Sequence, residues 1–545
     1  MNSSYFAYWP RGLPRHLTIP ATSLNYNVEV SAARFGAKTF LQFYGTSVSF
    51  AQFASSVDHL AGWLQREGVC PGDRVVLDLQ NSPQFVIAYY AILRADAVAV
   101  PVNPMNRTEE LLHVVLDSGA RFAVVGQENW DLMSGIPAQV LPRILVAAYS
   151  DYLDAGSLTQ VPDFLREPRR VLNDPRVSFW ADALAAGLRA GPSVAGPNDS
   201  CAIIYTSGTT GAPKGALHTH RSAMATTVGG MQWNGMHQDD IVLAVLPFFH
   251  VTGMQCSMNG PLYVGATVVL LPRWNALEAA RLVSEHRVTS WTVISTMLVD
   301  FLANEDVQSW DLSSLRKIGG GGAAMPAAIA KKLEEMGLSY VEGYGLTETM
   351  APTHVNPPEH PKRQCLGIPV QDVESIIIDP QTLKELPQGE VGEIVSRGPQ
   401  LFQRYWNNPQ ATAEAFLDID GKRYFRTGDL GRVDEDGYFF MVDRLKRMIN
   451  AAGFKVWPAE VETIMYAHPA IKEVCVVSAK DAYRGETVKA VIALKPQFRA
   501  STTAEDIIAW SREHMAAYKV PRIVSFVEAL PRSGTGKLLW RTLQD

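Results

Sequence analysis

The stretch "YTSGTTGAPKG", residues 205–215, combines four Ser/Thr hydroxyls, three glycines and one lysine directly after the apolar run 202–204. A strand that opens into such a loop leaves backbone N–H groups and hydroxyls able to face phosphate oxygens, because no large side chain is in the way. The P-loop of nucleotide hydrolases requires a Ser or Thr after its lysine, whereas here Pro213 precedes Lys214 and Gly215 follows it. The stretch therefore indicates a phosphate site of another kind, with a plain surface turn as the alternative.

Six further stretches place a glycine next to a charged or hydroxyl residue at the end of an apolar run. They are "LPFFHVTG" (246–253), "GGGGAAMP" (319–326), "EGYGLTET" (342–349), "YFRTGDLG" (424–431), "DRLKRMINAAGFKVWPAEVE" (443–462) and "PRSGTGKLLWR" (531–541). Each is a weak signal alone, since Asp429 also fits a turn, Arg444 a surface salt bridge and Glu348 a solvated helix cap. Taken together, their order and spacing along the chain are a much more specific signal than any one stretch.

Strand-like and helix-like segments alternate from about residue 48 to about residue 379. "RVVLDL", "FAVVG" and "CAIIYTS" are typical of strands, and "ALEAARLVSEH" and "PAAIAKKLEEMG" have helical spacing. This alternation predicts an α/β architecture with largely parallel sheets. Residues 373–441 instead show strands joined by tight turns, which predict a smaller and more antiparallel module.

A last segment opens at "PAEVETIMYAH", where Pro458 takes the first position of a helix. It predicts a small, mobile α+β domain, and we place the boundary so that residues 1–443 form the large domain and residues 444–545 the small one. A chain of 545 residues is too long for a single core. The large domain is expected to hold two α/β subdomains and a small β-barrel-like module.

The composition argues against several classes of binding partner and of protein. The net charge is −6, so the chain lacks the excess of positive charge that is typical of nucleic-acid-binding proteins, and nucleic acid is not expected as a partner. The N-terminus lacks the pattern of a signal peptide, and the most apolar stretch is broken by Arg94 and Asp96 before it could span a bilayer. Five scattered cysteines suggest neither a disulfide framework nor a zinc site. We expect a cytoplasmic protein, with peripheral membrane contact and a homodimer left open.

In this combination of motifs the chain resembles the acyl-adenylate-forming superfamily, which includes acyl-CoA synthetases, firefly luciferase and the adenylation domains of peptide synthetases. The resemblance runs from about residue 40 to the end. It implies that a carboxylate attacks the α-phosphate of ATP to give acyl-AMP and pyrophosphate, and that a thiol then displaces AMP. Both steps pass negative charge through their transition states, which positioned cations and backbone donors stabilise.

The resemblance also implies roles for individual residues. Thr206 and Glu348 would bind Mg²⁺, which prefers oxygen ligands, and Lys537 would bridge the carboxylate and the α-phosphate. Asp429 and Arg444 would hold the ribose. The residues implied in ATP and AMP binding are Thr206, Ser207, Gly208, Thr209, Thr210, Gly211, Lys214, Gly322, Ala323, Glu342, Gly343, Tyr344, Gly345, Thr347, Asp429, Arg444 and Lys537.

Lys537 would have to withdraw before the thiol enters, which implies a rotation of the small domain about a hinge at Lys446. Ala452, Gly453 and Phe454 resemble the loop that lines the coenzyme A tunnel after this rotation. No carrier-protein motif follows Lys537, so free coenzyme A is the expected thiol. The alternatives are a phosphotransferase, which would release ADP, and a non-catalytic paralogue that binds acyl-AMP. Such a paralogue would usually lack Lys537 or Glu348, and both are present.

The nature of the acid is the least determined feature. Residues 249–252, "FHVT", lack the Asp with which peptide-synthetase domains hold an amino-acid ammonium. We expect an apolar pocket, with His250 acting at the acyl-AMP as the gate of the family or, alternatively, as a hydrogen-bonded core histidine. The expected acid-binding residues are Trp233, His250, Val251, Met254, Gly321 and Gly345.

The segment "RMINAAGFKVWPAEVE" resembles the medium- and long-chain fatty acyl-CoA branch, with methylthiopropionate ligases close by. Asn450 and Lys455 differ from the Lys and Gln of many aryl-CoA ligases. The prediction is an acyl-CoA synthetase for a medium- or long-chain fatty acid that uses ATP, Mg²⁺ and coenzyme A. A ligase for a short thioether acid such as 3-methylthiopropionate, or for an aryl acid, is the alternative.

Overall fold

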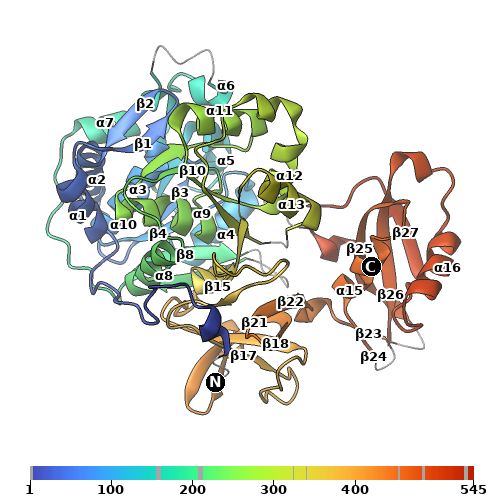
Figure 1. The fold of residues 1–545 in the computed structure, drawn as a ribbon. Coiled ribbons are helices and arrows are strands. Elements are labelled where there is room, and N and C mark those ends of the chain that lie inside the picture. The colour runs from blue at the N-terminus through green and yellow to red at the C-terminus, as the bar shows by residue number, and fades with distance from the viewer. Residues whose placement is uncertain are drawn as a thin grey trace. The chain divides into compact units, whose positions relative to one another are not determined.

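The computed structural model describes residues 4–154, 161–206, 213–322, 325–338, 340–451, 454–481, 485–532 and 538–544 (Figure 1). The chain divides into two compact units. Unit 1 comprises Met1–Glu374 and Ser396–Phe425, and unit 2 comprises Ser375–Val395 and Arg426–Asp545. The boundary predicted at residue 443 is of another kind, because it marks the segment that is expected to rotate. It stays a prediction.

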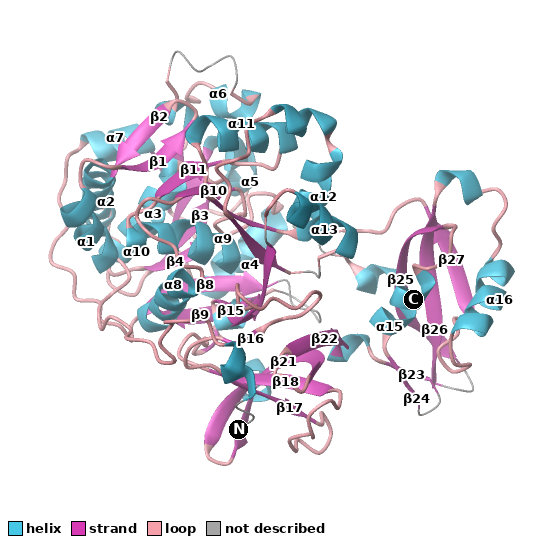
Figure 2. Ribbon diagram, viewed as in Figure 1, coloured by secondary structure: helices cyan, strands magenta, loops and turns pink. Residues whose placement is uncertain are grey.

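Two large sheets form the centre of unit 1 (Figure 2). The nine-stranded sheet has the order β16 (Ile368–Pro369), β15 (Ala351–Val355), β14 (Tyr340–Leu346), β13 (Lys317–Gly321), β12 (Ser290–Val293), β10 (Ile241–Ala244), β11 (Thr267–Leu270), β1 (Thr39–Phe43), β2 (Thr46–Ser49). The eight-stranded sheet has the order β19 (Arg404–Tyr405), β9 (Lys214–Thr219), β8 (Ser200–Thr206), β4 (Val98–Pro101), β3 (Arg74–Asp78), β5 (Phe122–Gly126), β6 (Arg143–Ala147), β7 (Val177–Phe179).

The central pairings of both sheets are parallel, as the alternating pattern predicts. Antiparallel pairs occur towards the ends, where β8 meets β9 and β14 meets β15. The α/β expectation is therefore confirmed. Strands β8 and β9 flank the hydroxyl- and glycine-rich stretch, of which residues 207–212 lie outside the described residues.

Helices cover the sheets of unit 1 and fill the space between them (Figure 2). They are α1 (Tyr26–Phe35), α2 (Phe50–Arg66), α3 (Pro83–Arg94), α4 (Thr108–Ser118), α5 (Trp130–Ser134), α6 (Asp163–Arg166), α7 (Trp180–Ala185), α8 (His220–Trp233), α9 (Val251–Met254), α10 (Gly260–Val264), α11 (Ala276–His286), α12 (Ser295–Ala303), α13 (Ala327–Glu335) and α14 (Pro409–Glu414).

Helix α3 explains the most apolar stretch of the sequence. The Ser82 hydroxyl accepts a hydrogen bond from the Phe85 amide at 3.2 Å and Pro83 starts the helix, so its beginning is well defined. Every residue from Pro83 to Leu93 is buried, in one core that includes α2 and strands of both sheets. A helix that is apolar on all faces belongs in such a core. Among the described residues, no helix has the length and hydrophobicity needed to cross a membrane.

A third, smaller sheet has the order β17 (Glu374–Ile378), β18 (Gly392–Arg397), β21 (Lys422–Val433), β20 (Phe416–Ile419), with β22 (Phe439–Arg444) beside β21. Strand β21 pairs antiparallel with both β20 and β22. This sheet confirms the expected change to antiparallel pairing after residue 373.

The fourth sheet forms the C-terminal part of unit 2. Its order is β24 (Phe454–Val456), β23 (Ile449–Ala451), β26 (Gly485–Leu494), β25 (Ile471–Asp481), with β27 (Ile523–Val527) parallel to β26. Helix α15 (Pro458–Met465) contacts β25, and α16 (Ala504–His514) contacts β27 (Figure 1). The α+β expectation for this part of the chain is confirmed.

Candidate active site

The β8/β9 hairpin presents the ends of the predicted phosphate loop. Thr206 is the last residue of β8, and it pairs in register with Lys214, the first residue of β9. The predicted loop residues Ser207, Gly208, Thr209, Thr210 and Gly211 lie outside the described residues. The strand pairing therefore fixes the two ends of the loop, Thr206 and Lys214, beside each other.

Glu348 lies close to this hairpin. It belongs to a short 3-10 turn, η7 (Thr347–Thr349), which contacts β8. The Tyr405 hydroxyl donates a hydrogen bond of 2.6 Å to Glu348 Oε1, and the Phe402 amide donates one of 2.8 Å to the Glu348 carbonyl oxygen. The Lys214 ammonium lies 5.2 Å from the centre of the Tyr405 ring. One tyrosine thus contacts both the predicted metal-binding carboxylate and the predicted phosphate-binding lysine.

His218 on β9 forms a hydrogen bond with the same turn, η7. Its Nε2 donates to the Thr347 carbonyl oxygen at 2.8 Å. Burial lowers the pKa of His218 to about 4, so the ring is neutral at physiological pH and carries its proton on the nitrogen that faces the carbonyl. We call Lys214, His218, Glu348 and Tyr405 the Glu348 corner. The sequence analysis missed His218 and Tyr405, because neither stands in a hydroxyl- or glycine-rich stretch.

Strand β14 carries the predicted nucleotide residues 342–345. The Glu342 carboxylate accepts hydrogen bonds from the backbone amides of Met325, at 2.7 Å, and Cys365, at 3.3 Å. Burial raises the pKa of Glu342, and the side chain is committed to the backbone of neighbouring segments. Tyr344 packs against His354, with the two ring centres 5.7 Å apart.

The glycines of β13 serve two different purposes. A Cβ on Gly321 would lie 2.1 Å from the Gly343 carbonyl oxygen, so this glycine is required by the close approach of β14. Gly322 has a φ of +85° and nothing within 4 Å of a Cβ, so it faces open space. Ala323 lies outside the described residues. Gly345, like Gly321, leaves no room for a side chain, since its Cβ would lie 2.2 Å from the Ala351 carbonyl oxygen.

In unit 2, the two predicted ribose residues face each other. Asp429 on β21 pairs in register with Arg444 on β22, and Arg444 Nε lies 3.2 Å from Asp429 Oδ1. Asp429 is buried and stands within a strand rather than in a turn. The salt bridge that was the plain alternative for Arg444 is thus formed with the other predicted ribose residue.

The predicted hinge residue, Lys446, lies two positions after Arg444 in the chain. Lys446 is the middle residue of the 3-10 turn η8 (Leu445–Arg447), after β22. Just before the turn, Asp443 Oδ2 accepts a hydrogen bond from the Ala459 amide at the start of α15, at 2.7 Å. Ala452, Gly453 and Lys537 lie outside the described residues, and of Phe454 only the backbone on β24 is described.

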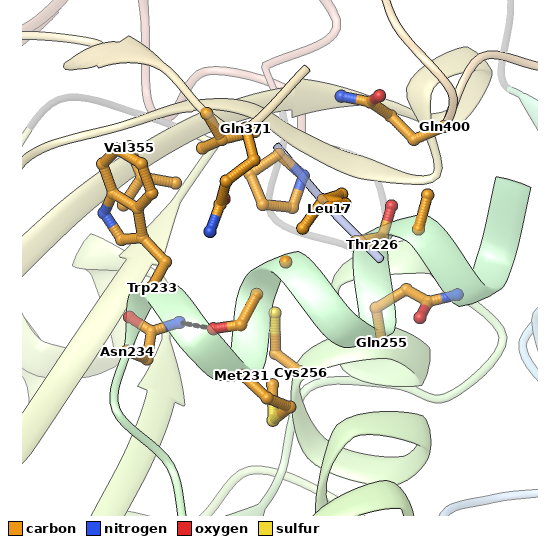
Figure 3. A pocket seen from close by; sticks show the side chains of 15 residues that line it. Leu17, Thr226, Met231, Trp233, Asn234, Gln255, Cys256, Val355, Gln371 and Gln400 are labelled. Carbon is orange, nitrogen blue, oxygen red and sulfur yellow. Dashed lines mark hydrogen bonds between the residues drawn. The ribbon is translucent and has the colours of Figure 1, made fainter. Parts of the chain in front are cut away.

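A small cavity lies along helix α8 in unit 1 (Figure 3). It has a volume of about 30 Å³ and is lined by α8, the π-helical segment η5 (Gln255–Asn259), β15 and residues 17, 370, 371 and 400. None of the described lining residues is Asp, Glu, Lys, Arg or His. We call it the acid cavity.

Of the predicted acid-binding residues, Trp233 lines this cavity. Its indole Nε1 donates to the Asn356 carbonyl oxygen at 3.2 Å. Val251 and Met254 lie in the hydrophobic core instead, and His250 is exposed, with Nδ1 accepting a hydrogen bond from the Thr252 amide at the start of α9. His250 is therefore not the buried core histidine of the alternative reading.

The sequence analysis missed most of the cavity wall, including Leu17, Gln255, Cys256, Gln371 and Gln400. These residues come from segments far apart in the chain. One signal was present in the sequence: Gly229 and Gly230 are consecutive glycines inside a helix, and such a pair destabilises a helix unless a neighbour must come close.

Comparison with known proteins identifies the family. The chain matches the AMP-binding enzyme family over residues 28–406 and the AMP-binding enzyme C-terminal domain over residues 460–537. It is 33% identical to a long-chain-fatty-acid–CoA ligase of Bacillus subtilis, over 99% of this chain and 97% of that protein. It is 34% identical to a feruloyl-CoA synthase of an Amycolatopsis species, over 91% of this chain and 93% of that protein.

Solved structures agree with this assignment. The ATP-bound structure of MatB from Rhodopseudomonas palustris superposes with a TM-score of 0.83 at 27% identity, covering 96% of this chain and 98% of that one. The resemblance inferred from the motifs is confirmed. The chain belongs to the AMP-binding enzymes of the acyl-adenylate-forming superfamily, and it is an AMP-forming acid–CoA ligase that uses ATP and coenzyme A.

Proposed function

We propose that the Glu348 corner binds the polyphosphate of ATP and its metal ion. Lys214, the first residue of β9, supplies a positive charge for the phosphates, and Thr206, its partner in register on β8, supplies a hydroxyl. The carboxylate of the acid attacks the α-phosphorus, the bond to the bridging oxygen of pyrophosphate breaks, and acyl-AMP forms. The coenzyme A thiol then loses its proton and attacks the acyl carbon, and AMP leaves.

Mg²⁺ fits this corner by the chemistry of its donors. Thr206 offers a hydroxyl and Glu348 a carboxylate, and Mg²⁺ binds such oxygens together with substrate phosphates. The ion would neutralise charge on the phosphates when bound. Tyr405 donates a hydrogen bond to Glu348 Oε1, which orients the carboxylate. Burial raises the pKa of Tyr405, so its hydroxyl keeps the proton that it donates.

We propose that the acid has an uncharged tail, and that a medium- or long-chain fatty acid is the primary candidate. The observation that carries this proposal is the absence of any Asp, Glu, Lys, Arg or His among the described residues lining the acid cavity. A second charge on the acid would be buried there without a counter-charge, which is costly. The similarity to the Bacillus subtilis long-chain ligase supports the same choice.

A hydroxylated aryl acid is the second candidate, and a specific observation favours it. Among the described residues, three that line the cavity each have a buried polar atom without a hydrogen-bond partner: Thr226 Oγ1, Gln255 Nε2 and Gln371 Oε1. Buried polar atoms are normally satisfied, so these three are suited to a polar group on a ligand. Two amides and a hydroxyl would suit a phenol, as the similarity to a feruloyl-CoA synthase also suggests.

The test is product analysis with ATP, Mg²⁺, coenzyme A and a panel of acids. The panel comprises straight-chain acids from C4 to C16, benzoate, 4-hydroxycinnamate, ferulate, 3-methylthiopropionate and malonate. For a fatty acid, each CH₂ that the enzyme buries should raise kcat/KM by a factor of about 3 to 4, from roughly 0.8 kcal/mol per methylene. An optimum on a phenolic acid would select the second candidate. An optimum on malonate would contradict the uncharged tail.

A further inference from the structure

The side chain of Asp443, just before the predicted hinge at Lys446, contacts residues that lie after the hinge. We propose that Asp443 is a positioning residue of the enzyme. It caps helix α15 in one of the two orientations that the two half-reactions need, and so biases the balance between acyl-AMP formation and transfer to coenzyme A. The proposal goes beyond the proposed function and rests on the predicted rotation about Lys446.

Asp443 belongs to the part of the chain before the hinge. It stands on β22, where it pairs in register with Leu430 of β21, and the next residue, Arg444, pairs with Asp429. The Asp443 side chain is buried. Because β22 is paired with β21 up to Arg444, Asp443 stays with the β21 sheet when a segment after Lys446 rotates.

The beginning of α15 lies after the hinge and is capped by Asp443. The N-cap residue Trp457 forms no side-chain cap, since an indole has no acceptor, and Pro458 has no amide hydrogen. The Glu460 amide donates to the Trp457 carbonyl oxygen at 3.1 Å, whereas the Ala459 amide donates to Asp443 Oδ2 at 2.7 Å. A carboxylate at this place satisfies a helix N–H that has no partner within the helix, and it lies at the positive end of the helix dipole.

Arg447, the first residue after Lys446, is attached to the same part of the chain as α15. Its guanidinium forms an ion pair with Glu462 on α15 and donates to the Val476 carbonyl oxygen on β25 at 3.2 Å. Its Nη1 also lies 3.6 Å from Asp443 Oδ1. In a rotation about Lys446, Arg447 would therefore move together with α15 and β25, and Asp443 contacts both Arg447 and α15.

These two contacts form in one orientation and break in the other, because a rotation about Lys446 carries Ala459 and Arg447 away from Asp443. The cap therefore stabilises only the first orientation, and removing it shifts the population towards the second. Acyl-AMP formation and thioester formation use different orientations if the hinge operates. Loss of the Asp443 carboxylate should thus slow the half-reaction that uses the capped orientation and not the other one.

Asp443→Ala should change the ratio of the two half-reaction rates by about tenfold, which corresponds to about 1.4 kcal/mol, a usual contribution of a helix cap. Asp443→Asn keeps an oxygen that can accept from the Ala459 amide but loses the charge that faces Arg447. It should change the ratio in the same direction by a smaller factor.

The experiment measures each half-reaction in single turnovers at saturating substrate. Pyrophosphate release is followed with ATP, Mg²⁺ and the acid of the panel above that has the highest kcat/KM, and thioester formation is followed with the adenylate of that acid and coenzyme A. The matched control is Glu460→Gln. Glu460 is also a carboxylate in the first turn of α15, but its ion-pair partner Lys519 lies after the hinge as well, so the ratio should not change. Melting temperatures show whether each variant is folded.

A changed ratio in both Asp443 variants, with Glu460→Gln like the wild type, supports the proposal. An unchanged ratio in Asp443→Ala overturns it, and so does an equal change in Glu460→Gln. An effect through Arg444, whose amide donates to Asp443 Oδ1 at 2.7 Å, looks different. It would raise the KM for ATP and for the adenylate together and leave the ratio at saturation unchanged, which also overturns the proposal.

Lys446→Pro in the same assay distinguishes a failure of the cap from a failure of the hinge. If Lys446→Pro separates the half-reactions and Asp443→Ala does not, the hinge stands and the role of Asp443 is rejected. If neither variant separates them, the rotation about Lys446 is wrong, and the role of Asp443 is rejected with it.

Discussion

The Glu348 corner consists of charged and aromatic side chains that contact one another or the η7 turn, whereas the described residues that line the acid cavity are all uncharged. In the corner, Tyr405 bonds Glu348 and packs on Lys214, and His218 bonds the backbone of the same turn. Among the described residues, three that line the cavity each carry a buried polar atom without a hydrogen-bond partner.

This difference implies that the two regions respond differently to substitution. Changes at groups that handle the phosphates should lower kcat/KM for every acid by the same factor, because all acids share ATP. Changes in the cavity wall should alter the ratio between acids. The variants of Lys537 and Tyr405 test the first kind of change.

The largest effect is expected for Lys537→Ala. If Lys537 bridges the carboxylate and the α-phosphate, its loss should reduce acyl-AMP formation by roughly 100-fold or more, on the order of 3 kcal/mol, with one factor for all acids. Thioester formation from supplied acyl-AMP should survive. Pyrophosphate release and thioester formation are measured separately, and an equal loss in the two half-reactions would reject the role.

A smaller effect, confined to one half-reaction, is expected for Lys446→Pro. Proline fixes φ near roughly −65° and removes the amide hydrogen, which should obstruct a rotation about the η8 turn. We expect acyl-AMP formation to persist and thioester formation to fall by at least about tenfold. Single-turnover measurement of each half-reaction, with Lys446→Ala as the control, tests the hinge. Unimpaired overall turnover would count against it.

Tyr405→Phe should weaken the response to Mg²⁺. The substitution keeps the ring against Lys214 and removes only the hydrogen bond to Glu348, and a hydrogen bond to a charged group contributes about 1.5–3 kcal/mol. We expect about a tenfold loss at limiting Mg²⁺ that added Mg²⁺ partly restores. Titration of activity with Mg²⁺ measures it. A Mg²⁺ dependence identical to that of the wild type would remove Tyr405 from the positioning of Glu348.

The remaining prediction concerns stability at acidic pH rather than activity. Burial lowers the pKa values of His218 and His220 to about 4 and that of His354 to about 3. Below pH 6.5 the unfolded chain takes up protons that the folded chain does not, so stability falls as pH drops towards 4. The slope is about 1.4 kcal/mol per pH unit for each group.

His218→Gln isolates one of these groups. The glutamine amide can still donate to the Thr347 carbonyl oxygen, but it does not titrate. We expect similar melting temperatures for this variant and the wild type at pH 7.5, and a shallower decline for the variant between pH 6.5 and 5. Parallel declines would show that His218 does not contribute to the pH dependence.

Much of the fold could be predicted from the sequence, because hydrophobic periodicity is a local property. The alternating segments correctly predicted strands such as β3, β5 and β8 and helices such as α11, and Pro458 correctly predicted the start of α15. The order of seven polar stretches was enough to identify the superfamily. The roles of Thr206, Glu348, Asp429, Arg444 and the other nucleotide residues stay predictions.

The sequence by itself determined the family, the α/β class and the reaction, since these depend on which residues occur and in what order. Only the tertiary structure decided which side chains meet. It brought Tyr405 and His218 to Glu348 through the pairing of β9 with β19 and β8, and it placed Leu17 opposite Gly229. These contacts join residues far apart in the chain, and a contact that depends on sheet register and side-chain packing leaves no local pattern in the sequence.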